Sequence, residues 1–171
     1  MKPPILLKTI LDICFFILLI SLIASMGIIL SHLFLTSEGM PIYLNDHIIG
    51  EITMPKIILL ILAIFQAGIF LFSVYTLRKV VHNFFKKRLF TSIQITGLNL
   101  AGRLIVLASI LDAIVSFSSN LILESNLKLR FGIESTFGSF WLQLAMGLFL
   151  ILLSKSFEKA KSFKEENELT V

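Results

Sequence analysis

Three polar side chains interrupt long uncharged runs of the sequence, and they are the residues best placed to do chemistry. Asp112 follows Arg103 by nine residues, which is about 13 Å along a helix and near the middle of a bilayer. A carboxylate at that depth costs about 2.5–3.5 kcal/mol, so it should face the protein interior with a partner. Gln66 and Gln143 lie at a similar depth. We predict a polar layer made of Asp112, Gln66, Gln143, Ser109 and Ser116.

Two interpretations of this layer remain open. It could handle protons or cations, or it could be an interhelical clamp worth about 1 kcal/mol per hydrogen bond. A transport route normally needs several ionisable groups, whereas Asp12, Arg103 and Glu124 stand near the ends of the apolar runs. The clamp is therefore favoured. Gly102, Ser109, Asp112 and Ser116 share one helical face, which agrees with either interpretation.

The sequence contains no pattern that indicates an enzyme. Cys14 is the single cysteine, so a paired-thiol oxidoreductase is excluded. The histidines His32, His47 and His82 match no metal-binding spacing. There is no nucleophile with a recognisable base, and we predict no metal, no cofactor and no enzymatic activity.

The composition predicts an integral membrane protein. Of 171 residues, 56% are hydrophobic and only 15% charged, with a mean hydropathy of +0.92. Uncharged runs long enough to cross a bilayer predict helical spans near 13–35, 57–77, 104–123 and 135–154. We expect an all-α membrane protein of four transmembrane helices, with residues 1–171 in a single domain and a tail at 155–171.

Loop charge predicts how the chain is oriented. A basic loop between the second and third spans carries six cations and no carboxylate, namely Arg78, Lys79, Lys86, Lys87, Arg88 and Arg103. Such a segment stays cytoplasmic, against an anionic inner leaflet. Both termini are then cytoplasmic as well. The net charge of +4 is explained by topology and does not indicate direct binding of nucleic acid.

Several local patterns predict structure at the span ends. Residues 42–53 have β-rich flanks around Asn45 and Asp46, and 127–133 alternate with period two, which predicts a small extracytoplasmic β element. Thr91 and Gln94 fit a capping box that starts a helix. In the tail, Lys161 with Glu165 and Lys164 with Glu168 have the i,i+4 spacing of helical ion pairs.

The C-terminus resembles the ending of a bacterial membrane family catalogued as domain of unknown function 2975. The motif is Lys164, Glu165, Glu166, Asn167, Glu168, Leu169, Thr170 and Val171. The sequences 77–79 and 90–91 and the position of Gly102 are similar to that family too. The resemblance implies a four-helix protein of the bacterial inner membrane and a gene beside a small Cro-like helix-turn-helix regulator. It implies no activity.

Two functions from different classes follow. The first is a non-enzymatic membrane protein whose basic loop and tail bind or control a cytoplasmic partner, with the helix-turn-helix regulator as a candidate. The second is a small transporter or proton-handling protein that uses Asp112.

Overall fold

The computed structural model describes residues 5–34, 42–44, 47–49, 53–84, 91–123 and 135–169. Its framework is four long helices. They are α1 (Ile5–Phe34), α2 (Met54–Phe84), α3 (Ser92–Leu123) and α4 (Ser135–Leu169). All four are long and apolar enough to cross a membrane, so the prediction of a multi-pass helical protein is confirmed.

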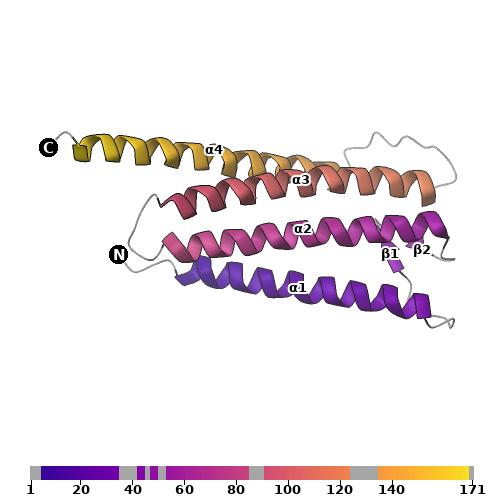
Figure 1. Cartoon of the computed structure of the whole chain (residues 1–171). Coiled ribbons are helices and arrows are strands. Elements are labelled where there is room, and N and C mark those ends of the chain that lie inside the picture. The colour runs from indigo at the N-terminus through magenta and orange to yellow at the C-terminus, as the bar shows by residue number, and fades with distance from the viewer. Residues whose placement is uncertain are drawn as a thin grey trace.

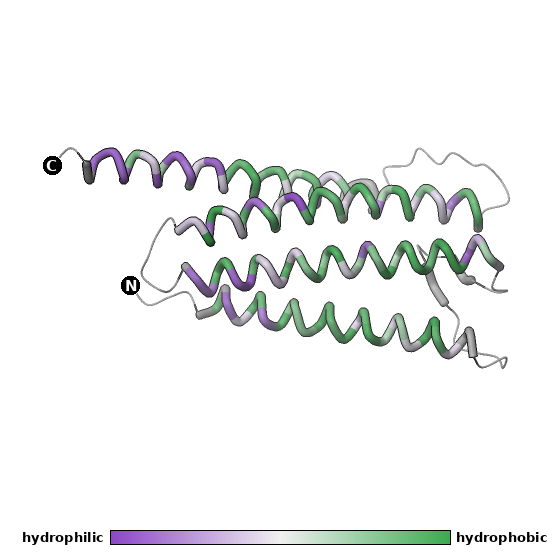
Figure 2. Tube along the Cα trace, in the orientation of Figure 1, coloured by the Kyte–Doolittle hydropathy of each residue, from purple (hydrophilic) through white to green (hydrophobic). Residues whose placement is uncertain are grey.

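The helices run up and down in chain order, and each packs chiefly against its neighbours in the sequence (Figure 1). Thus α2 and α3 each have two substantial partners, whereas α1 packs mainly against α2 and α4 mainly against α3. The first turns of α1 and α3 and the last turns of α2 and α4 gather at one end. Figure 2 shows that hydrophilic residues concentrate at this end and that apolar residues fill the middle of the helices.

Helices α2 and α3 extend beyond the predicted spans, into the segment that was predicted to be a basic loop. Helix α2 continues to Phe84, so Arg78 and Lys79 are helical, and Arg103 lies within α3. Basic side chains favour the C-terminal turns of a helix and can reach the aqueous interface from within it. The loop is therefore shorter than the sequence suggested. Lys86, Lys87 and Arg88 lie outside the described residues.

The start of α3 has the predicted capping box. The Thr91 backbone N–H donates to Gln94 Oε1 at 3.1 Å, and the Gln94 N–H approaches Thr91 Oγ1 at 3.4 Å. These contacts satisfy amide groups that a helix start leaves unpaired. Gln94 is fully buried, so its side chain also packs in the protein interior. The capping prediction is confirmed.

Helices α3 and α4 approach each other closely at a pair of glycines. A Cβ atom added to Gly102 would lie 2.7 Å from the carbonyl oxygen of Gly147, and one added to Gly147 would lie 3.0 Å from the carbonyl oxygen of Gly102. Further along, the Ser154 hydroxyl donates to the Ile95 carbonyl at 2.8 Å. Small residues let membrane helices pack backbone against backbone. Gly102 and Gly147 therefore set the α3–α4 spacing.

A short antiparallel pair of strands precedes α2. Strand β1 (Ile42–Leu44) pairs with β2 (His47–Ile49), with Ile42 opposite Ile49. The two halves of 42–53 thus pair, over three residues each, but a pair this small is not stable by itself. The possible third strand at 127–133 lies outside the described residues. The predicted extracytoplasmic β element is therefore not supported by this short pair.

Candidate functional site

The centre of the predicted polar layer joins α2 to α3. The Gln66 side chain donates from Nε2 to Asp112 Oδ1 at 3.4 Å, which is long for a hydrogen bond. Both side chains are partly buried between the helices. A carboxylate and an amide that lie 46 positions apart in the chain are therefore brought together within the membrane.

The other members of the layer are arranged differently from the prediction. Gln143 on α4 is half-buried, but among the described side chains it forms no hydrogen bond with Gln66 or Asp112. Ser109 is fully buried and donates to the Val106 carbonyl of its own helix at 2.8 Å. The carbonyl of Ser116 accepts a similar bond from Ser119. Helical serines reach the carbonyl three residues back, so they need no partner on another helix. Among Gln66, Asp112 and Gln143, the polar contact between helices is the pair formed by Gln66 and Asp112.

A second polar contact, between α1 and α2, was not predicted. Arg78 Nε donates to Asp12 Oδ1. The Arg78 guanidinium also lies 5.4 Å from the ring centre of Phe15 and 5.7 Å from that of Phe16. An arginine can combine an ion pair with stacking on aromatic rings. The sequence did carry a signal for this contact, because Asp12 and Arg78 have opposite charges at the same end of antiparallel spans.

Two other basic residues of the predicted set face outward. Lys79 on α2 and Arg103 on α3 are both exposed. Arg78 differs from them because Asp12 neutralises its charge. The three described members of the set, Arg78, Lys79 and Arg103, are therefore not equivalent cations.

The C-terminal motif continues α4 past the beginning of α3. Lys161 Nζ donates to Ser92 Oγ at 3.0 Å. This hydrogen bond joins α4 to the first residue of α3, and the rest of α4 continues beyond it. Lys161 also pairs with Glu165 at 3.5 Å, as the spacing predicted. Lys164, Glu165, Glu166 and Asn167 are exposed. Glu168 and Leu169 complete the helix, and Thr170 and Val171 lie outside the described residues.

Metal binding finds no support in the residues the structure describes, because no three histidine, cysteine, aspartate or glutamate side chains among them come together as potential ligands. Cys14 is exposed on α1.

The apolar helices and their composition define a multi-pass membrane protein. Within that class, residues 42–171 match the model of a family described as "Protein of unknown function (DUF2975)". The match covers most of the chain, so the protein belongs to this family. The matched region begins at residue 42 and therefore includes β1, β2 and α2 as well as the motifs from 77 onward. No curated protein and no solved structure matches the chain.

Proposed function

We propose that this protein is a non-enzymatic protein of the bacterial inner membrane that binds a cytoplasmic protein through the end of α4. The observation that carries this proposal is the C-terminal extension, defined as residues 162–169, in which the large apolar side chain of Phe163 is 63% exposed. The last turn of α2 and the first turn of α3 lie at the same end of the molecule as this extension (Figure 1).

The extension projects from the packed helices. The contact between Lys161 and Ser92 joins α4 to the first residue of α3. Beyond it, residues 162–169 continue for about two turns, or roughly 12 Å. Figure 1 shows this end of α4 reaching past the neighbouring helices. A helix that projects in this way can enter a groove on another protein.

The charge of the extension favours a protein partner over the membrane surface. Residues 162–169 contain Lys164 against three glutamates, Glu165, Glu166 and Glu168, for a net charge of −2. An acidic helix is repelled by an anionic leaflet and attracted to a basic protein surface. DNA-binding regulators present such a basic surface. The helix-turn-helix regulator implied by the family resemblance is therefore our candidate partner, and the extension would compete with DNA for it.

Binding of a cytoplasmic partner requires the end of α4 to lie in the cytoplasm, and this orientation of the chain in the membrane is a separate prediction. Because six cations lie from Arg78 to Arg103 and four more follow Ser154, we expect both ends and the α2–α3 connection in the cytoplasm. Reporter fusions at Lys87 and Val171 should report the inside. Fusions at Asp46 and Asn126 should report the outside. Activity of a cytoplasmic reporter at Asp46 would reverse the topology.

The partner proposal is tested by site-specific crosslinking in living cells. A photoreactive phenylalanine analogue at Phe163 should capture the regulator as a soluble protein. The same analogue at Leu152, which is on α4 and 62% exposed, should not capture it. In a separate pull-down with an added chemical crosslinker, truncation after Ser162 and the double charge reversal E165K/E166K should both abolish capture, whereas K155E/K159E should preserve it. Crosslinks from position 163 only to lipid or to a second copy of this chain would refute the proposal.

The alternative function is transport of protons or cations through Asp112. The observation in its favour is that this carboxylate lies within the membrane and contacts Gln66. Against it, the described ion pair nearest in the bundle, Asp12 with Arg78, joins α1 to α2 near the helix ends and does not continue a route from Asp112. Substitutions of Asp112 distinguish the two functions.

A further inference from the structure

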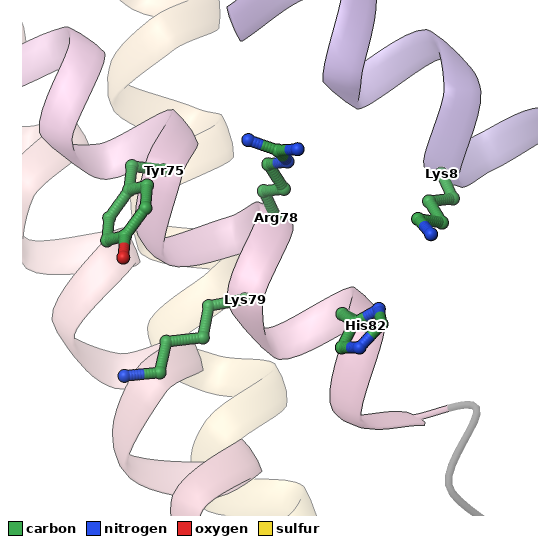
Figure 3. A pocket seen from close by; sticks show the side chains of 5 residues that line it. All are labelled: Lys8, Tyr75, Arg78, Lys79 and His82. Carbon is green, nitrogen blue, oxygen red and sulfur yellow. The ribbon is translucent and has the colours of Figure 1, made fainter.

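A basic cavity lies between α1 and α2 near their cytoplasmic ends, if the orientation proposed above holds. It has a volume of about 280 Å³ and is lined by Lys8, Tyr75, Arg78, Lys79 and His82. Figure 3 shows Arg78 pointing toward α1, while Tyr75 and Lys79 extend from another side of α2. The cavity thus combines cationic groups with a phenol hydroxyl.

The cavity has positive charge that the protein itself does not balance. Asp12 pairs with Arg78 and neutralises it. Lys8 and Lys79 are exposed and, within the described parts of the chain, form no ion pair with a carboxylate. His82 is exposed beside them and adds a ring that can donate or accept a hydrogen bond. Two unpaired ammonium groups with such neighbours suit a phosphate group.

A separate apolar groove lies further along α2, toward the middle of the helix. It has a volume of about 420 Å³ and includes Leu22 of α1, Phe65, Gly68 and Phe72 of α2, and Leu104 of α3. Gly68 contributes to the space, since nothing lies within 4 Å of the position that its Cβ would occupy. The groove is open because α1 and α3 flank α2 without closing over it.

The groove and the cavity follow one face of α2. Phe65, Gly68, Phe72, Tyr75, Lys79 and His82 are separated by three, four, three, four and three residues. That spacing keeps side chains on a single helical face. From Phe65 to Lys79 the helix rises by about 21 Å, more than the roughly 15 Å of hydrocarbon in one leaflet of a 30 Å core.

We infer that this face of α2 binds one anionic phospholipid, with its phosphate group in the basic cavity and an acyl chain along the apolar groove. Lys79 and Lys8 attract the headgroup by their charge, and the Tyr75 hydroxyl, which extends from the same side of α2 as Lys79, can donate a hydrogen bond to it (Figure 3). Basic pockets between membrane helices at the cytoplasmic side suit such headgroups. A free phosphate ion would occupy the basic cavity alone, whereas a phospholipid occupies both the cavity and the apolar groove. The site is distinct from the C-terminal extension and does not depend on a protein partner.

The headgroup contacts are tested by native mass spectrometry of the full chain in detergent, titrated with phosphatidylglycerol or phosphatidylcholine. We expect preferential binding of phosphatidylglycerol. Removal of each lysine should weaken it about fivefold, and K8Q/K79Q should weaken it about 25-fold. The matched control K155Q/K159Q removes two exposed lysines of α4 at the same end of the molecule and should bind as the wild type does. Equal loss in both double variants would show unspecific surface attraction and overturn the proposal.

The groove is tested by G68L, which places a side chain in open space along the proposed acyl path. G27L is its control, because a Cβ at Gly27 on α1 also meets nothing within 4 Å. We expect G68L, but not G27L, to reduce phosphatidylglycerol binding at least fivefold. Inorganic phosphate at millimolar concentration should displace little lipid. If phosphate competes fully, or if G68L binds lipid as the wild type does, the site takes an anion without its acyl chain and the proposal fails.

Discussion

The substitution Gly102→Ala is expected to lower the free energy of unfolding by about 1–3 kcal/mol, which is the usual cost of overpacking a tight contact. The added methyl group would lie 2.7 Å from the Gly147 carbonyl oxygen and 3.0 Å from the Ile151 backbone nitrogen. Both obstacles are backbone atoms, which cannot rotate away as a side chain can. Helices α3 and α4 must therefore separate, and the Ser154 contact with Ile95 should weaken with them. Unfolding in mixed micelles with increasing sodium dodecyl sulfate, followed by circular dichroism, measures the loss.

Gly27→Ala provides the control for this experiment, because the position on α1 is open. It replaces glycine by the better helix former without a clash and should be neutral or slightly stabilising. Gly147→Ala should resemble Gly102→Ala, since its methyl group would lie 3.0 Å from the Gly102 carbonyl oxygen. If both α3 and α4 variants are as stable as Gly27→Ala, these glycines do not set the helix spacing.

The second large effect is expected at Asp112. If its role is to hold α2 against α3, Asp112→Asn should be nearly silent, because an amide can keep the bond to Gln66 without placing a charge in the membrane. Asp112→Leu should cost about 1–3 kcal/mol, because Gln66 loses its partner between the helices. Stability is measured in detergent as for the glycine variants. Asn120→Leu is the control on the same helix, since Asn120 is exposed.

A cellular phenotype of the same variants distinguishes the two functions. A residue that carries protons must titrate, and an amide does not, so transport through Asp112 predicts that Asp112→Asn is as harmful as Asp112→Leu. A role in binding a cytoplasmic partner predicts a normal phenotype for the Asn variant. A stable Asp112→Asn protein with no cellular activity would show that the carboxylate is more than a structural contact.

Hydrophobic run length was sufficient to predict the four helices, because a membrane span needs about 20 apolar residues whatever its neighbours are. The start of α3 was predictable for a similar reason. Thr91 and Gln94 lie three positions apart, and the capping bonds depend only on this local spacing. The continuation of α2 through Arg78 and Lys79 was less evident, since charge marks the membrane boundary but does not end a helix.

Contacts between helices were predicted less well. The approach of Gly102 to Gly147 depends on which faces of α3 and α4 meet, and small residues occur at several other positions in these spans. The polar layer was overestimated for a related reason. The predicted depths in the membrane placed Gln66 and Asp112 at the same level, and these two residues do meet. Depth does not determine how α4, which carries Gln143, is rotated about its own axis. Ser109 was also placed in the layer, although its hydroxyl donates to the Val106 carbonyl of its own helix.

The chain-order arrangement of the helices has a consequence for assembly in the membrane. None of the α1 side chains that the structure describes is fully buried, whereas α2, α3 and α4 contribute all of the buried residues in the described core. Segments with few buried contacts open at a lower free energy than the rest of a protein. Since α1 packs chiefly against α2, it can leave while the other three helices stay joined. Among the four described helices, α1 is therefore expected to be the last to pack during folding and the first to detach from the bundle.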